Sequence, residues 1–370
     1  MLIAVTDWPS LARPALGRLS AYDPGASAEE MRRRYGVAEI IRLNRNEDLF
    51  EPFPGALEAA AAELANVSRY PEESHREFAA AVAQWSGTTP DRVIPGHGIQ
   101  ALIGTLATAL VDTGDAVVVA RPSYGLYAQV CTGRGADVHV VALHELRLDL
   151  GAMAQRARET EARLVWVCDP NNPTGSLIGE DEWRAFLDAL PQRCAVAVDE
   201  AYGDYADPDR RVFRVRDVHD GRPIVILRTF SKLFGLAGLR LGYAIADPSM
   251  AAILNAAHEP FNVNRPALAA GLECLRHPEI IDARRRAVAA ARELLTERLV
   301  AAGIEAVASQ ANFVLALIGG DERELAGALA EREGLLVRPG SDFGIPGAVR
   351  ITVGPAELME RVAAAIAGLR

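Results

Sequence analysis

Residues 164–175 have the sequence LVWVCDPNNPTG, in which five apolar residues are followed at once by Asp, Pro and Asn. A run that is apolar on both alternating faces predicts a strand covered on both sides, which is typical of a buried, mostly parallel sheet. Helical or loop stretches separate four more short runs of this kind: AVVVA (116–120), AVAVD (195–199), IVIL (224–227) and LGYAI (241–245). The sequence therefore predicts an α/β protein with a mostly parallel central sheet.

The chain is expected to divide into three parts. Residues 1–42 form an N-terminal arm that contributes to a smaller domain, residues 43–263 form the large domain, and residues 264–370 form the small α+β domain. The last part opens with a long predicted helix over 280–302, whose apolar residues recur on one stripe. Short predicted strands and a final helix follow, the strands lying in ANFVLALI (311–318), LLVRPG (335–340) and AVRITVG (348–354).

Composition excludes several classes of function. The formal net charge of -10 argues against nucleic acid as the main partner, because phosphate binding needs a basic face. No apolar run approaches the roughly 18 residues of a membrane span, and Asp7 interrupts an N-terminus that has no basic region of a signal peptide. The four cysteines are scattered without metal-type pairing, so we expect core thiols in a reducing cytoplasm and no metal site.

Chemically distinctive groups follow several of the predicted strands. In open parallel sheets, ligands gather outside the carboxyl ends of the strands. The groups found there are Tyr124 after the first run, Asp169–Gly175 after the second, Asp199–Tyr202 after the third and Lys232 after the fourth, with a glycine turn at Pro95–Leu106 that runs into a helix. Each alone has an ordinary explanation as a surface lysine, a cap, a tight turn or a packed aromatic. Their joint placement at one edge of a sheet favours a site.

Together these groups match the needs of pyridoxal 5′-phosphate (PLP). Its aldehyde condenses with a lysine amine, its ring nitrogen needs an acid, and its 3′-oxygen needs hydrogen-bond donors. The ring needs an aromatic stacking partner, and the phosphate needs N–H groups at a helix start together with a cation. The sequence therefore predicts PLP as the cofactor.

The chain resembles the fold-type I PLP-dependent enzymes, within them the class I/II aminotransferases, and most of all their histidinol-phosphate aminotransferase branch. The resemblance covers nearly the whole chain. It rests on these motifs in order: AYDPG, LNRNED, YPEE, PSYGLY, DPNNPTG, DEAY, SKLFGLAGLRLGY, ANFV and VRITVG. It implies an aspartate-aminotransferase-like fold and a homodimer with shared active sites.

The resemblance also implies roles for individual residues. Lys232 would form the internal Schiff base and then act as the general base, and Asp199 would pair with the pyridine nitrogen. Cofactor contacts are expected from Tyr202 and Asn172 at the 3′-oxygen, Tyr124 on the ring, Arg240, Ser231, Thr229 and the N–H groups of Gly98, Ile99 and Gln100 at the phosphate, and Tyr70 at the cofactor of the neighbouring subunit. Substrate contacts are expected from Arg350, Arg338, Tyr22, Asn44 and Asn312.

The phosphate turn departs from the family pattern. His97 and Ile99 stand where the family often has small or polar side chains, so side-chain contacts from this turn are not implied, whereas backbone N–H groups still serve. Lys232 already supplies the base, which favours a local packing or hydrogen-bonding role for His97.

The substrate is predicted to be L-histidinol phosphate, with 2-oxoglutarate as amino acceptor, in histidine biosynthesis. One pocket would then accept a phosphate in one half-reaction and a carboxylate in the other, and the planar fork of arginine suits both anions. For Arg338, a surface ion pair is an alternative role.

Three alternatives for the protein remain open: an aromatic amino acid aminotransferase, a decarboxylase of a phosphorylated amino acid such as threonine phosphate, and a non-catalytic PLP-fold sensor, for which no segment is left to hold a DNA-binding module.

Overall fold

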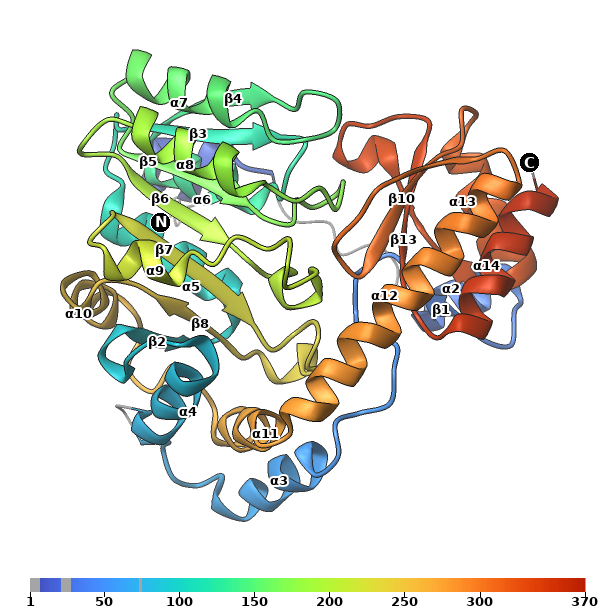
Figure 1. Cartoon of the computed structure of the whole chain (residues 1–370), viewed down its shortest axis with the longest axis horizontal. Helices are drawn as coiled ribbons and strands as arrows, with labels where there is room; N and C mark the ends of the chain where they lie inside the picture. The colour runs from blue at the N-terminus through green and yellow to red at the C-terminus, as the bar shows by residue number, and fades with distance from the viewer. Residues whose placement is uncertain (1–6, 21–27, 73–74, 370) are drawn as a thin grey trace, which may run out of the picture.

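The computed structural model describes residues 7–20, 28–72 and 75–369, and the predicted substrate residue Tyr22 lies outside these ranges. Its central feature is a seven-stranded sheet in the order β2-β8-β7-β6-β5-β3-β4, in which only β8 runs antiparallel to its neighbours (Figure 1). The strands are β2 (Val93–Gly96), β3 (Ala116–Arg121), β4 (Asp137–Ala142), β5 (Leu164–Cys168), β6 (Ala195–Asp199), β7 (Ile224–Thr229) and β8 (Gly242–Ile245). The predicted mostly parallel α/β architecture is confirmed.

Alternating side chains of this sheet fill two separate cores. Val118 points into one core and Val117 and Val119 point into the other, as period-two geometry requires. One face is covered by α5 (Gly98–Leu110), α6 (Leu126–Arg134) and α10 (Pro248–Ala257). Helices α7 (Leu150–Glu159), α8 (Glu180–Ala189) and α9 (Val215–His219) cover the other face. Burial on both faces explains why these strands lack polar alternation.

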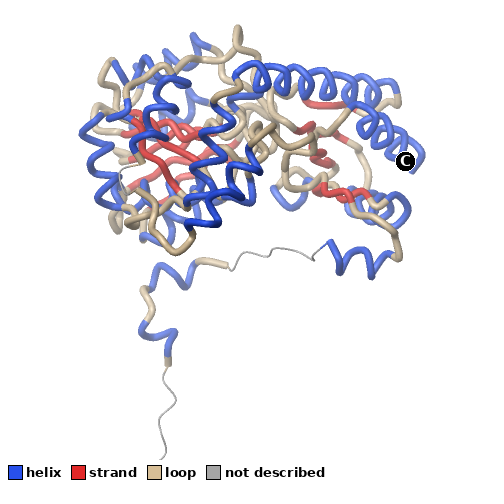
Figure 2. The backbone as a smooth tube through the Cα atoms, turned by 90° about the horizontal axis from the view of Figure 1, so that it is seen from below, coloured by secondary structure: helices blue, strands red, loops and turns tan. Residues whose placement is uncertain are grey.

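A second sheet lies beside the first and has the order β12-β13-β10-β9, all antiparallel. Its strands are β9 (Glu305–Val307), β10 (Phe313–Leu317), β12 (Arg338–Pro339) and β13 (Ala348–Thr352). Helices α13 (Glu322–Glu333) and α14 (Ala356–Leu369) complete this part, and the long α12 (Pro278–Ala301) runs from the large domain to the second sheet, where it packs against α14, β9 and β10 (Figure 1). Figure 2 shows the strands in two separate groups.

The N-terminal segment joins the second part of the chain. Strand β1 (Ile41–Arg42) pairs in parallel with β11 (Leu335–Leu336), and α2 (Ala28–Tyr35) contacts α13. Helix α11 (Arg265–Leu275) packs against α3 (Ala56–Ala62) and α4 (Arg76–Ser86). The limits 1–42, 43–263 and 264–370 remain a prediction.

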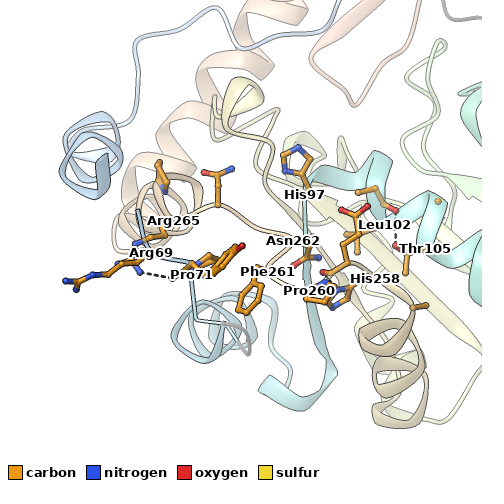
Figure 3. A pocket seen from close by; sticks show the side chains of 18 of the residues that line it. Arg69, Pro71, His97, Leu102, Thr105, His258, Pro260, Phe261, Asn262 and Arg265 are labelled. Carbon is orange, nitrogen blue, oxygen red and sulfur yellow. Dashed lines mark hydrogen bonds between the residues drawn. The ribbon is translucent and has the colours of Figure 1, made fainter. Parts of the chain in front are cut away.

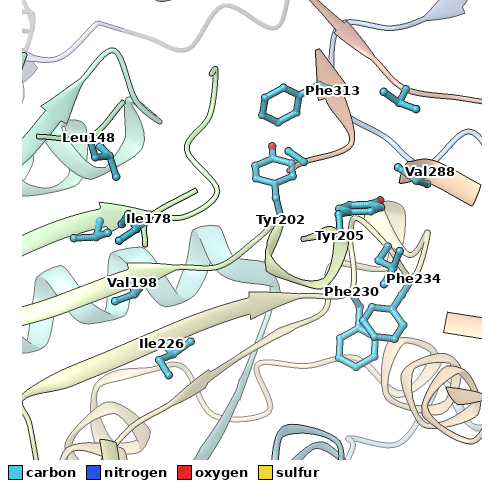
Figure 4. Close-up of a cluster of buried hydrophobic side chains, with 14 of the residues drawn as sticks. Leu148, Ile178, Val198, Tyr202, Tyr205, Ile226, Phe230, Phe234, Val288 and Phe313 are labelled. Atoms are coloured by element: carbon cyan, nitrogen blue, oxygen red, sulfur yellow. The ribbon is translucent and has the colours of Figure 1, made fainter. Parts of the chain in front are cut away.

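One apolar cluster continues from the large sheet into the second part of the chain. Tyr202, which follows β6, lies edge to face with Phe313 of β10, with ring centroids 5.0 Å apart (Figure 4). Tyr205, Val288 of α12 and Phe234 belong to the same buried cluster. The residues after β6 are therefore packed from both sides. No helix in the described ranges is long and apolar enough to cross a membrane.

Several segments differ from the sequence prediction, among them the unpredicted short strands β1 and β9. Strands β2 and β4 were not predicted, because Pro95 interrupts β2 and the partly exposed edge strand β4 carries Asp137 and His139. The segment LLVRPG, predicted as one strand, is divided between β11 and β12, which belong to different sheets. Which sheet a short strand joins depends on its pairing with distant strands, and the local pattern of apolar residues carries no information about that pairing.

A buried ion cluster lies beneath the turns that follow β5 and β6. The side chain of Arg214 donates to Asp169 at 2.6 Å and to Glu200 at 3.1 Å, and all three residues are about 1 % exposed. Glu200 also accepts from Arg211 at 2.7 Å and from Arg228 at 2.9 Å, and these cations hold its pKa far below the usual range. Arg214 stacks on Trp183 at 4.3 Å. The cluster therefore ties two strand-end turns together.

We expect Arg214→Ala to lower the free energy of unfolding by about 3–5 kcal/mol, because it leaves two buried carboxylates without their shared cation. Denaturant unfolding monitored by circular dichroism measures this loss. The matched control is Arg216→Ala, which removes a half-exposed pair with Glu180 and should cost less than about 1 kcal/mol. Equal losses in the two variants would contradict the structural role of the cluster.

Candidate active site

A cavity of about 600 Å³ opens where the strands of the large sheet end. We call it the strand-end cavity. It brings together residues from turns far apart in the sequence, as expected for the carboxyl edge of a parallel sheet. The predicted residues that line it are Asn44, Ile99, Gln100, Tyr124, Asn172, Asp199, Tyr202, Thr229, Ser231, Lys232, Arg240, Arg338 and Arg350.

Lys232 is the only lysine in the sequence, and every other Lys-or-Arg position carries arginine. It follows β7, and its amine donates to the backbone carbonyls of Asn46 at 2.8 Å and Arg45 at 3.2 Å. Removal from water lowers the pKa of this amine to about 8, and the positive charge of Arg350 contributes in the same direction. The amine is therefore able to lose and regain a proton near neutral pH.

Asp199 ends β6 and is only 3 % exposed. Its carboxylate accepts from the Tyr127 hydroxyl at 2.6 Å and from the Ala201 N–H at 2.9 Å. Burial raises the pKa of Asp199, and none of the arginines in the described ranges forms an ion pair with it. A buried carboxylate at the wall of a cavity without an arginine partner is suited to a ligand that brings a cationic ring nitrogen.

Arg240 and the start of α5 lie together at the cavity wall and offer a candidate anion-binding site, which we call the anion seat. Arg240 donates to the Ala237 carbonyl at 2.9 Å and approaches the Ser231 hydroxyl at 3.4 Å. Gly98 has a φ of +73°, and a Cβ there would lie 2.7 Å from an Arg240 nitrogen, so only glycine permits this approach. No side chain caps the start of α5. Free N–H groups, a helix N-terminus and a guanidinium together fit a phosphate.

Two arginines from the second sheet close the cavity. Arg350 on β13 and Arg338 on β12 are direct cross-strand partners. Arg350 donates to the Asn172 side chain at 2.5 Å and to the Asn44 carbonyl at 2.8 Å, and burial lowers its pKa to about 10. Arg338 forms an ion pair with Asp342 at 2.8 Å while also lining the cavity. Arg338 therefore forms the ion pair that was its alternative role, and its side chain also lines the cavity.

Three of the remaining predicted residues lie outside the lining. Gly98 stands directly behind Arg240, and Asn312 is buried beneath the wall, where its amide donates to the Asn46 carbonyl at 3.2 Å. Tyr70 is 77 % exposed and stacks on Phe261, with ring centroids 4.6 Å apart. It lines a larger open pocket of about 980 Å³, between residues 67–71, the start of α5 and residues 257–266 (Figure 3).

Several lining or supporting residues were not predicted. Tyr127 stands with Tyr124 in the quoted motif PSYGLY, and Asn46 stands in the quoted motif LNRNED, so both were visible in the sequence as neighbours of predicted residues. The signal for Tyr127 was its position three residues after Tyr124, in the first turn of α6. Ser123 stands directly before Tyr124 in the same motif and gave the same kind of signal. Asp342 and Phe343 gave none, because only the tertiary structure brings their turn to the cavity.

A model of the family described as aminotransferase class I and II matches residues 38–366. The chain belongs to this family. It is 38% identical over 358 residues to the histidinol-phosphate aminotransferase of Symbiobacterium thermophilum, covering 96% of this chain and 98% of that protein. It is 37% identical over 344 residues to the enzyme of the same name from Geobacillus thermodenitrificans, and the match covers 93% of this chain and 94% of that protein.

Among solved structures, the chain is similar to histidinol-phosphate aminotransferase from Sinorhizobium meliloti in complex with pyridoxal-5′-phosphate. The TM-score is 0.88 at 26% identity, and the match covers 96% of each chain. The fold and the family predicted from the motifs are thereby confirmed.

In the cofactor-free protein, acylation of the lysine amine should rise with a midpoint near pH 8, because burial and Arg350 disfavour its charged form. Short pulses of acetic anhydride followed by peptide mass spectrometry measure this, and the single lysine makes the signal unambiguous. Arg350→Gln should raise the midpoint, since a nearby positive charge is lost. A midpoint at the ordinary value of 10.5 in the wild type would rule out this environment.

Proposed function

We propose that this PLP-dependent aminotransferase transfers the amino group of L-histidinol phosphate to 2-oxoglutarate, giving imidazole acetol phosphate and L-glutamate in histidine biosynthesis. The observation that carries the proposal is the strand-end cavity, whose lining brings together the one lysine, a buried carboxylate and two cross-strand arginines. The curated relatives at 34–38% identity that bear the name histidinol-phosphate aminotransferase support the choice of substrate.

The residues present fit PLP, which supplies an aldehyde and an electron-withdrawing ring when it is bound. Lys232 would hold the aldehyde, and Asp199, kept in place by Tyr127, would face the ring nitrogen. The remaining contacts would come from Tyr202 and Asn172 at the 3′-oxygen, from Tyr124 on the ring, and from Arg240, Ser231, Thr229 and the N–H groups of residues 98–100 at the phosphate.

Within this arrangement Lys232 moves a proton. Its pKa of about 8 leaves a useful fraction of neutral amine near pH 7, so Nζ accepts a proton from the substrate carbon and returns it at a neighbouring position. The backbone carbonyls of Asn46 and Arg45 hold the free amine at the cavity wall. Asp199 stays buried and keeps its orientation through two hydrogen bonds.

The acidic end of the substrate is assigned to the two arginines. Arg350 presents a planar fork held by Asn172 and the Asn44 carbonyl, which suits either a carboxylate or a phosphate. Its Nε is buried without a partner among the described residues, so a hydrogen-bond donor remains for a ligand. Arg338 would add a second positive charge for a phosphate dianion, and the phosphate would then replace Asp342 as its ion-pair partner.

The active protein is proposed to be a cytoplasmic homodimer. Tyr70 is far more exposed in the single chain than a stacked aromatic residue usually is, which fits a contact with a second copy. The four cysteines are free and buried, as is usual in a reducing compartment. Tyr70 would then complete the anion seat of the neighbouring subunit.

A panel of amino donors tests the reaction. Purified protein loaded with PLP should form glutamate from 2-oxoglutarate fastest with histidinol phosphate, compared with phenylalanine and threonine phosphate. Lys232→Ala should form none and should lack the visible absorbance of the lysine-bound cofactor. Preference for phenylalanine would indicate an aromatic aminotransferase, and carbon dioxide from threonine phosphate a decarboxylase. Either result would replace the proposed substrate.

Mixed dimers test the shared active site. Tyr70→Ala and Lys232→Ala should each be strongly impaired, because each removes one member of every site. Unfolding and refolding the two together should restore about a quarter of wild-type activity, since half of the dimers are hybrids with one intact site. If Tyr70 served only its own chain, mixing would restore nothing, and the arrangement would be disproved.

A further inference from the structure

Asn46 is a buried residue to which the predicted chemistry gives no role. It is 1 % exposed and has a φ of +54°, in the left-handed region that few residues other than glycine and asparagine adopt. It lies in the segment that follows β1 and lines the strand-end cavity. Buried position and left-handed backbone together indicate that its surroundings specify this conformation.

Five hydrogen bonds join Asn46 to both parts of the molecule, one of them from the Thr352 hydroxyl to the Asn46 side-chain oxygen at 3.4 Å. Its carbonyl accepts from the Lys232 amine at 2.8 Å and from the Asn312 amide at 3.2 Å. Its N–H donates to the Thr352 hydroxyl, and its side-chain amide donates to the Tyr202 hydroxyl, both at 3.0 Å. Lys232 and Tyr202 follow strands of the large sheet, whereas Asn312 immediately precedes β10 and Thr352 ends β13 of the second sheet.

The bond to Tyr202 decides the direction of the phenol proton. Because the phenol oxygen accepts from Asn46, its own proton is left for a partner on the cavity side. A hydroxyl that accepts one hydrogen bond donates a stronger one, since the two bonds polarise each other. The amide therefore both aims the Tyr202 proton and makes it a better donor.

We propose that Asn46 is a positioning residue, which directs the Tyr202 hydroxyl toward the cofactor oxygen through its side chain and seats the free Lys232 amine through its carbonyl. This inference rests on the proposed function, because it assigns a partner to the Tyr202 proton. It also explains Asn312, which lies outside the cavity and supports the Asn46 carbonyl that holds Lys232.

The charged and titratable groups around Tyr202 and Lys232 are known from the structure. Asp199 and Cys168 face them from the sheet, Arg240 from the turn after β7, Arg350 from β13 and Glu47 from the segment that contains Asn46. Asn46→Gly changes none of these charges, and glycine adopts a left-handed backbone without strain. The variant therefore removes the side-chain donor while the backbone carbonyl stays in place.

The experiment is a pH titration of the visible absorbance of cofactor-loaded protein. A hydrogen bond from Tyr202 stabilises negative charge on the ring oxygen of the cofactor, and this disfavours protonation of the neighbouring lysine nitrogen. Weakening the hydrogen bond therefore raises the pH midpoint of the absorbance change. We expect Asn46→Gly to raise it by about 0.5 to 1 pH unit, the size expected for one lost hydrogen bond. Asn46→Asp, which is isosteric and draws the Tyr202 proton away from the cavity, should raise it further.

Two controls separate positioning from loss of structure. Ser86→Ala removes a contact of 3.2 Å to the buried hydroxyl of Tyr243 outside the cavity, so it should leave the midpoint unchanged. In a Tyr202→Phe background, Asn46→Gly should cause no further shift, because the two residues act through one hydrogen bond. Acylation of the lysine in cofactor-free Asn46→Gly should keep its wild-type midpoint, because the carbonyl remains.

Each outcome is decisive. A midpoint in folded, loaded Asn46→Gly equal to that of the wild type overturns the inference, and so does an equal shift with and without the Tyr202 hydroxyl. If Asn46→Gly does not fold, Asn46→Asp with a wild-type midpoint overturns it as well. A wild-type protein that binds no cofactor at Lys232 would instead disprove the proposed function on which the inference rests.

Discussion

The pairing of β6 with β7 is the constraint on which the site depends. These parallel strands place Asp199 beside Leu227, so the turn that carries Lys232 begins next to the buried carboxylate. A lysine and an aspartate on separate flexible loops would each remain solvated. Because both are held at the edge of one sheet, Lys232 and Asp199 face the same cavity. Burial lowers the pKa of the Lys232 amine and raises the pKa of the Asp199 carboxyl group.

The rigidity of this edge comes from charges placed behind it. Asp169 and Glu200 immediately precede or follow the residues that face the cavity, and Arg214 binds both of them below the turns. A buried arginine shared by two turns keeps their spacing constant while the cavity side remains free for ligands. The stability of the fold and the geometry of the site therefore depend on the same contacts. This is common where the residues that touch a ligand are held in place by residues packed behind them.

The use of basic residues separates structural from chemical roles. Within the described ranges, arginine makes every buried ion pair, including those of the cluster around Glu200, because its charge survives burial and its fork makes several bonds. The one lysine occurs where a basic group must become neutral near physiological pH. This contrast makes Lys232 distinctive even before a family is considered.

Much of the site followed from motifs after apolar runs. Asp199, Asn172, Tyr124 and Lys232 were predictable because the carboxyl ends of parallel strands must share an edge. Tyr127 and Asn46 were missed although both stand in quoted motifs, since a motif that marks a neighbour of the site does not show a hydrogen bond to Asp199 or to Tyr202. The edge strand β4 was missed for a related reason, because its polar residues face solvent and its pairing with β3 is decided by the whole sheet.

By itself, the sequence determined the class of fold and the cofactor, and it predicted many of the residues that line the strand-end cavity, because hydrophobic periodicity and strand-end motifs are local properties. The tertiary structure decided which supporting residues meet. It divided LLVRPG between two sheets, brought Arg338 opposite Arg350, and joined Asn46 to both parts of the molecule. Such contacts depend on register and on packing between distant segments, and a local pattern carries no information about either.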